Sequence, residues 1–165
     1  MTPSEAPLPP DSLLARLARE RGAFADAYTL HFPHPVSLAE FVEAFYTTRL
    51  FKVERALLAL FGRPSSDAMA RAVARGDGER LAVWTVEARE DDELLMHEDS
   101  GATRSWFKAQ ADAGHTTLWF GSAIVPRRRG PGGEPRFSVV FHALLGFHRG
   151  YSRALLGAAA RRLSR

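Results

Sequence analysis

The chain has 165 residues, of which 45% are hydrophobic and 25% charged, and its formal net charge at pH 7 is +3. This composition is ordinary for a soluble globular protein, and the length suits one domain. Cysteine is absent from the sequence, which excludes disulfides, thiolate metal sites and cysteine nucleophiles. No uncharged apolar run approaches the roughly 18 residues of a membrane-spanning helix, so no membrane span is expected.

The basic residues are scattered and nearly balanced by acidic ones, which favours solvated surface over a nucleic-acid or anionic-membrane interface, and no nucleic-acid partner is expected. Their densest spots are Arg127–Arg129 and the C-terminal Arg161, Arg162 and Arg165. Residues 1–10 lack the basic and apolar regions of a signal peptide, so a cytoplasmic location is expected. Four prolines in the same ten residues predict a disordered tail, followed by a single domain over residues 11–165.

Helical signals dominate the first half of the chain. Asp11 is a candidate N-cap for a short helix that ends at Gly22, and residues 25–32 alternate as a strand does. The capping box Ser37–Glu40 opens a helical region that runs to Phe61 and that the pair Thr47-Thr48 divides in two. A buried stripe is expected along this region, formed by Phe41, Phe45, Leu50, Val53, Leu57 and Leu60. A further short helix fits Ser66–Ala74.

The second half begins with a two-residue period from about residue 79. Short turns separate four predicted strands, so neighbouring strands are expected to be antiparallel; the strands are Arg80–Glu87, Glu93–Glu98, Thr103–Ala111 and Thr116–Val125. After a loop over residues 127–135, apolar residues recur every three or four positions and predict a long terminal helix. Its stripe comprises Phe137, Phe141, Leu144, His148, Tyr151, Leu155 and Ala159. Residues 137–142 also suit a strand, and the helix is the favoured alternative.

These elements predict an α+β fold in which a curved antiparallel sheet with one apolar face grips the long C-terminal helix. The chain also contains several short motifs: Asp91–Leu95 with the second acidic turn Glu98-Asp99, Thr116-Thr117, and Phe147–Arg149. In these motifs the chain resembles an uncharacterised bacterial family, a domain of unknown function. That family is itself similar to the helix-grip superfamily of START and Bet v 1-like proteins (SRPBCC). The resemblance covers residues 26–163 and implies a helix-grip fold that binds apolar ligands.

Three residues of the terminal helix are candidates for catalysis. His148 is expected to face the sheet with Tyr151 on the same stripe, and Arg149 adjoins it. A buried histidine beside a tyrosine hydroxyl can act as a general acid or base, or can bind a ligand carbonyl. The alternative, which we favour, is a core histidine whose ring nitrogens bond to a backbone carbonyl or to the tyrosine.

A ligand-binding set is expected between the sheet and this helix. Three tryptophans, Trp84, Trp106 and Trp119, fall near the middle of predicted strands and would line a cavity if they shared its face. Arg104 lies on the face of Trp106, where it could meet a ligand carboxylate or pair with Glu87. The set is completed by Phe141, Leu144, His148 and Tyr151. The competing interpretation is that the aromatic rings fill the core.

No metal site or cofactor is predicted. His97 and Asp99 share one face of a strand but have no third ligand in view, and the sequence holds no phosphate-binding loop or dinucleotide motif. Three hypotheses for function remain. The leading one is a small module that binds an apolar or amphipathic small molecule. The others are a cyclase or dehydratase that uses His148, and a non-enzymatic interaction protein, either monomer or homodimer, that uses the basic segments.

Overall fold

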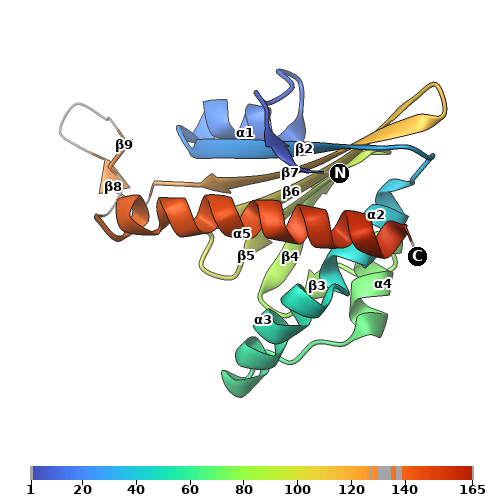
Figure 1. Cartoon of the computed structure of the whole chain (residues 1–165). Helices are drawn as coiled ribbons and strands as arrows, with labels where there is room; N and C mark the ends of the chain where they lie inside the picture. The colour runs from blue at the N-terminus through green and yellow to red at the C-terminus, as the bar shows by residue number, and fades with distance from the viewer. Residues whose placement is uncertain (1, 127, 130–134, 137–138, 165) are drawn as a thin grey trace.

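The protein is built on one seven-stranded antiparallel sheet with the strand order β1-β2-β7-β6-β5-β4-β3. The computed structural model (Figure 1) describes the backbone of residues 2–126, 128–129, 135–136 and 139–164, and the side chains of residues 2–126 and 149–164. The strands are β1 (Ser4–Glu5), β2 (Phe24–Phe32), β3 (Arg80–Leu81), β4 (Trp84–Arg89), β5 (Glu93–Glu98), β6 (Thr103–Asp112) and β7 (His115–Ile124). A separate ribbon pairs β8 (Arg128–Arg129) with β9 (Pro135–Arg136).

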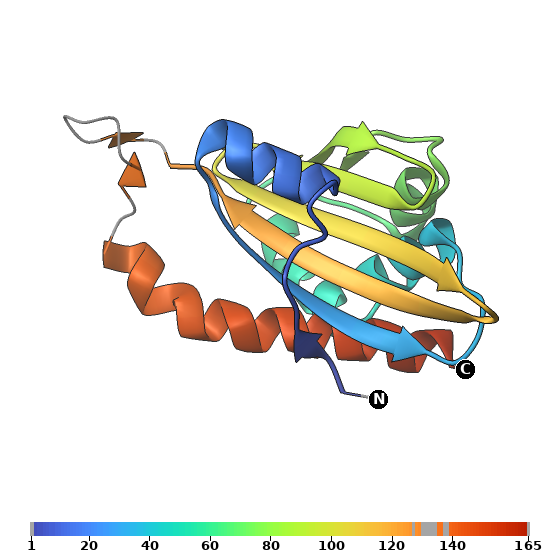
Figure 2. The same ribbon diagram turned by 90° about the horizontal axis from the view of Figure 1, so that it is seen from above.

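Helices pack on both faces of this sheet, with α1 on one face and α5 on the other (Figure 2). The described helices are α1 (Leu13–Arg21), α2 (Leu38–Tyr46), α3 (Arg49–Leu60), α4 (Asp67–Arg75) and α5 (Val139–Leu163). For residues 137–142, where helix was favoured over strand, the helix is confirmed from Val139 onward. Residues 137–138 lie outside the described backbone. No helix in the described parts of the chain combines the length and apolarity that crossing a membrane requires.

Side-chain caps explain where the first four helices begin. The hydroxyls of Ser12, Ser37, Thr48 and Ser66 each accept a hydrogen bond from a backbone N–H in the first turn. The capping box predicted at Ser37 is confirmed, because Glu40 also accepts from the Ser37 backbone N–H at 2.8 Å. The prediction of Asp11 as the first cap is wrong by one residue: Ser12 fills that position.

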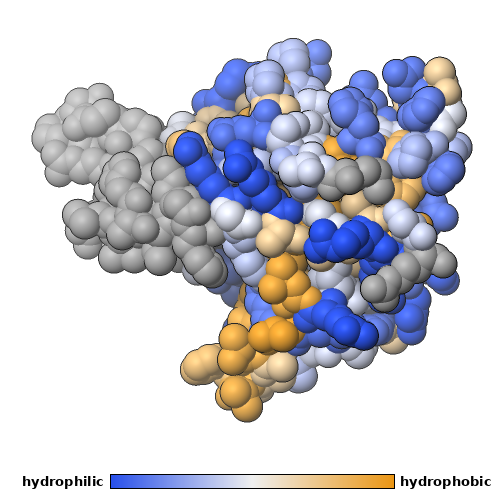
Figure 3. All heavy atoms as spheres, in the orientation of Figure 1, coloured by the Kyte–Doolittle hydropathy of each residue, from blue (hydrophilic) through white to orange (hydrophobic). Residues whose placement is uncertain are grey.

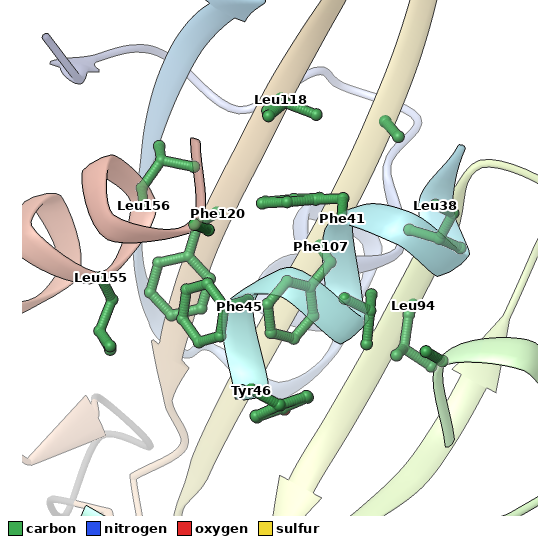
Figure 4. Packing of buried hydrophobic residues seen from close by; sticks show 14 of the residues in the cluster. Leu38, Phe41, Phe45, Tyr46, Leu94, Phe107, Leu118, Phe120, Leu155 and Leu156 are labelled. Atoms are coloured by element: carbon green, nitrogen blue, oxygen red, sulfur yellow. The ribbon is translucent and has the colours of Figure 1, made fainter. Parts of the chain in front are cut away.

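The main hydrophobic core lies between the sheet and α2, α4 and α5. Phe45 of α2 lies between two aromatic rings of neighbouring strands, with ring centroids 4.8 Å from Phe107 and 4.6 Å from Phe120 (Figure 4). Leu155 and Leu156 pack against the same cluster and hold the second half of α5 on the sheet. This arrangement of an antiparallel sheet and a long C-terminal helix fits a helix-grip fold.

A second core lies on the opposite face and corrects the expectation that the sheet has one apolar face. Leu13, Leu14 and Leu17 of α1 pack there against strand residues that include Trp106, and Trp119 adjoins the cluster. The glycine at position 121 allows this close approach, because a Cβ there would lie 2.7 Å from Leu14 Cδ2. Both faces of β6 and β7 are therefore covered by helices.

The predicted buried stripe is correct for α2 and wrong for α3. Phe41 and Phe45 are fully buried, but the exposed fractions are 61% for Val53, 55% for Leu57 and 80% for Leu60. Leu50, at the start of α3, is also exposed. The opposite side of α3 faces the protein instead, so the amphipathic pattern marks this helix correctly but not the direction of its apolar side.

Two smaller differences concern the strands. The predicted strand Arg80–Glu87 is divided into β3 and β4 by a tight turn in which Ala82 adopts a φ of 54°. Ser4–Glu5, within the predicted disordered tail, forms β1 and pairs with Thr29 and Tyr28 of β2. This part of the N-terminal stretch is therefore paired in the sheet.

Candidate functional site

A cavity of about 120 Å³ lies between the sheet and helices α2, α3 and α5. Its apolar wall is formed by Phe45, Phe51, Phe120, Trp84 and Leu155. Hydroxyl and carboxyl groups occur at the same cavity, contributed by Glu54, Tyr151 and the serines of β6, β7 and α5. Larger hollows elsewhere on the protein are more open to solvent, which makes this the best enclosed candidate site.

The sheet contributes a polar row beneath α5. Asp26, Ser122 and Ser105 lie side by side on β2, β7 and β6, in direct register, and all three are buried. Ser122 Oγ donates a 2.7 Å hydrogen bond to Asp26 Oδ1, and the Tyr28 hydroxyl donates to Asp26 Oδ2 at 3.3 Å. The sheet face is thus apolar under α2 and polar towards the part of α5 around Tyr151.

Two helices bring an acid and a phenol together at the cavity. The Tyr151 hydroxyl, from α5, donates a hydrogen bond to Glu54 Oε2, from α3. Burial raises the pKa of the Glu54 carboxyl, and the bond from Tyr151 lowers it in part. Burial, together with the bond to Glu54 and its charge, raises the pKa of Tyr151 well above its ordinary value. The phenol proton therefore stays on Tyr151, which donates it to Glu54 in surroundings that penalise negative charge.

The indole N–H of Trp84 is a hydrogen-bond donor without an acceptor. Trp84 lines the cavity from the start of β4, and its Nε1 atom is buried with no hydrogen-bond partner among the described residues. An unsatisfied buried donor costs roughly 1–3 kcal/mol. A bound molecule with an acceptor at this point would remove that penalty.

The structure brings some of the expected ligand-binding residues together and separates others. Trp84 and Tyr151 line the cavity, and Arg104 borders it. Arg104 also forms the ion pair that was the alternative to ligand binding, with Nε 2.7 Å from Glu87 Oε2. Trp106 belongs to the core under α1 and Trp119 packs against it, so the condition that the three tryptophans share one face is not met, and these two rings fill the core on the far side of the sheet.

The remaining candidates lie on α5 or at the end of β5. Arg149 is exposed and borders a different hollow, beside Glu5 and Asp26. The side chains of Phe141, Leu144 and His148 lie outside the described part of the structure, so the acid–base role considered for His148 stays a prediction. His97 Nδ1 lies 3.2 Å from the Glu98 carbonyl oxygen, and the described residues contain no cluster of three metal-ligating side chains.

Sequence reasoning missed Glu54, Ser105 and Ser122. Glu54 is the single acidic residue of α3, in an otherwise apolar and basic segment, and this contrast is the signal that could have identified it. The two serines interrupt the apolar pattern of their strands at paired positions. That pairing becomes visible only when the register of β6 and β7 is known.

Comparisons with known proteins found solved structures of low similarity. One is CalU16 from Micromonospora echinospora, with 11% identity and a TM-score of 0.32, over 85% of this chain and 83% of that one. Another is TTHA0849 from Thermus thermophilus, with 12% identity and a TM-score of 0.28, over 84% and 96%. The quaternary ammonium Rieske monooxygenase CntA aligns with 9% identity and a TM-score of 0.35, over 93% of this chain but 44% of its own length.

Neither protein-family models nor curated proteins gave a match to this chain. The description of the fold therefore depends on the architecture itself, with its antiparallel sheet and long C-terminal helix.

Proposed function

We propose that this protein is a START-like helix-grip module that binds one small amphipathic molecule between the sheet and α5. The observation that carries the proposal is the cavity itself, which is lined by aromatic rings, by the Tyr151–Glu54 pair and by Trp84, whose buried Nε1 has no hydrogen-bond partner among the described residues. Binding sites for small molecules typically combine a mainly apolar lining with a few polar groups that fix orientation.

The volume of the cavity limits the ligand. A volume of about 120 Å³ is below the roughly 300–1,000 Å³ of sites for drug-sized ligands. It is close to the roughly 150 Å³ of an apolar cavity that accepts benzene. The ligand, or the part of it that enters the cavity, is therefore about the size of one ring.

The electrostatic character of the cavity disfavours an anionic ligand. Burial already raises the pKa of the Glu54 carboxyl, so a second negative charge nearby would be unfavourable. The Trp84 N–H offers a donor and the Glu54 carboxylate an acceptor. These groups suit a neutral molecule that carries a hydroxyl or carbonyl group on an apolar body.

The proposal is tested with two small aromatic probes of similar shape, benzyl alcohol and ethylbenzene, which differ by a hydroxyl in place of a methyl group. Titration calorimetry or ligand-observed NMR measures the affinity of the full chain for each probe. We expect both probes to bind. The ratio of the affinity for benzyl alcohol to the affinity for ethylbenzene should be higher in the wild type than in the Trp84→Phe variant. One hydrogen bond contributes about 0.5–1.5 kcal/mol, so this change should be roughly two- to tenfold.

The opposite face of the sheet supplies a matched control. Trp119 Nε1 is also buried without a hydrogen-bond partner among the residues that the structure describes, but Trp119 packs against the core under α1. Trp119→Phe should leave the affinity ratio of the two probes unchanged. If neither probe binds at millimolar concentration, or if both variants change the ratio equally, the cavity is not a binding site of the proposed kind.

A further inference from the structure

Helix α3 presents apolar side chains to solvent on the side opposite to the cavity. Val53, Leu57 and Leu60 recur at helical spacing on this side, and Phe61, at the end of the helix, is 82% exposed. Leu50 extends the same stripe towards the start of α3. We name these five side chains the α3 patch. Figure 3 shows them as a hydrophobic region gathered over α3 at one end of the molecule.

Positive charge borders the α3 patch at its Leu50 end. Arg49 begins α3, and Arg161 and Arg162 of α5 border the same surface hollow as Arg49 and Leu50. In the described part of the chain these three arginines make no ion pair, and all three are exposed. In Figure 3, strongly hydrophilic atoms adjoin the hydrophobic ones on this face.

The acidic groups near the patch are already engaged. Glu54, the acid within α3, is bonded to Tyr151 on the cavity side. Asp67 pairs with Lys52 and Arg55, and Asp99 pairs with Arg63 and Arg80. The surface around the α3 patch therefore combines protruding apolar side chains with uncompensated positive charge.

We propose that the α3 patch docks on the surface of an anionic lipid bilayer. A helix with an exposed apolar stripe and basic flanks inserts its apolar side chains into the boundary between headgroups and acyl chains, while its cations approach the lipid phosphates. A second copy suits these arginines less well than an anionic surface does, because the acidic groups near its own patch are already paired and leave none to meet them. The proposal is independent of ligand binding in the cavity.

Vesicle flotation of the full chain tests the proposal. We expect the protein to bind vesicles of phosphatidylcholine and phosphatidylglycerol in a 7:3 ratio. It should bind phosphatidylcholine vesicles much less, and binding to the anionic vesicles should weaken at 500 mM NaCl, because surface charge is screened. The double variant Leu60→Ser/Phe61→Ser should lower the partition coefficient at least tenfold. Both side chains are exposed, so the unfolding midpoint should remain that of the wild type.

A charge variant with a matched control tests the basic flank. Arg161→Gln/Arg162→Gln should weaken binding to anionic vesicles about 25-fold, because each basic residue near an anionic surface contributes about fivefold. Arg19→Gln/Arg21→Gln removes the same charge from α1, on the other face of the sheet, and should have little effect. Equal losses in the two charge variants would overturn the proposal, since they would indicate attraction by net charge alone.

Two further results would also overturn it. One is a wild-type protein that does not float with anionic vesicles at 50 mM NaCl. The other is a dimer, detected by light scattering, that Leu60→Ser/Phe61→Ser converts to monomer, because a second copy would then cover the α3 patch.

Discussion

The indole N–H of Trp106 donates a 2.7 Å hydrogen bond to Oε2 of Glu93, a carboxylate buried between the sheet and α1. The same oxygen accepts from the backbone N–H of Leu13 at 2.8 Å, and Lys108 Nζ lies 3.0 Å from the other oxygen. One side chain of β5 thus binds the first turn of α1 and two residues of β6. Glu93 connects α1 to the sheet as a hydrogen-bonded counterpart to the apolar contacts of Leu13 and Leu14.

Replacing Glu93 should destabilise the protein, because the buried groups that donate hydrogen bonds to its carboxylate would lose their acceptor. Glu93→Ala leaves the Trp106 N–H and the Lys108 ammonium without this acceptor, and we expect a loss of about 3 kcal/mol in the free energy of unfolding. Glu93→Gln retains an acceptor oxygen and should cost about 1 kcal/mol. Urea unfolding followed by circular dichroism measures both. Glu90→Gln, which removes an exposed pair with Arg16, should leave the midpoint almost unchanged; an equal effect of Glu90→Gln would contradict this role for Glu93.

The Glu54 carboxyl should make stability depend on pH in a defined direction. Because its pKa is raised in the folded protein, the folded state retains the proton to higher pH than the unfolded chain does. Relative to Glu54→Gln, the wild type should therefore be most stable below the ordinary carboxyl pKa of 4.5, and should lose stability as the pH rises through the raised value. Urea titrations of both proteins between pH 4 and about pH 8 measure the difference. If the free energies of unfolding of the wild type and Glu54→Gln changed in parallel with pH, Glu54 would be solvated.

Removing the Tyr151 hydroxyl should shift this pH dependence. Its hydrogen bond lowers the pKa of Glu54, so Tyr151→Phe should raise that pKa further. The fall in stability should then occur at higher pH than in the wild type. The same urea series checks this. A curve displaced to lower pH would mean that Tyr151 does not donate to the carboxylate.

All three tyrosines should resist ionisation in the folded protein. Burial, assisted by the charges of Asp26 and Glu5, raises the pKa of Tyr28 to about 12. Burial also raises the pKa values of Tyr46 and Tyr151 above 10, and the charge of Glu54 contributes to both. An absorbance titration at alkaline pH should show almost no tyrosinate at pH 10.5, whereas the urea-unfolded chain should titrate near pH 10. Stability should consequently fall above pH 10, because only the unfolded chain releases these protons.

Two glycines should respond to alanine in opposite directions. At Gly121 a Cβ would lie 2.9 Å from both the Asp26 carbonyl oxygen and Trp106 Cε3, so we expect Gly121→Ala to cost about 2 kcal/mol or more. At Gly150, in α5, a Cβ meets nothing within 4 Å. Gly150→Ala should therefore stabilise the protein by up to about 1 kcal/mol through helix propensity. Thermal unfolding of the two variants gives the signs, and a stabilised Gly121→Ala would mean that α1 packs less closely on β7.

Local signals predicted the elements well. The strand Glu93–Glu98 has its predicted bounds, and the break at Thr47-Thr48 falls between α2 and α3, where Thr48 caps the second helix. Gly22 ends α1 in the left-handed conformation, with a φ of 61°. Each of these features depends on residues close together in the sequence, through hydrogen bonds or backbone preferences that act within one turn.

The candidate site was harder to predict because it depends on which face each side chain occupies. Trp106 and Phe107 are consecutive and both fully buried, because helices cover both faces of β6. Alternation in such a strand gives no indication of which face looks towards α5. Leu57 and Leu60 likewise face solvent because Phe51 and Glu54, elsewhere around α3, pack against the rest of the protein. The position of Tyr151 could be predicted, because one long helical stripe places it on the side of α5 that faces the sheet.

The short outer strands also affect how this protein behaves at high concentration. Open sheet margins recruit strands from other molecules and begin aggregation, and proteins counter this with brief or irregular outermost strands. Here β1 and β3 have two residues each and occupy the two margins of the sheet. They interrupt the rows of backbone donors and acceptors that an incoming chain would need, so growth by strand addition has no long template at either margin.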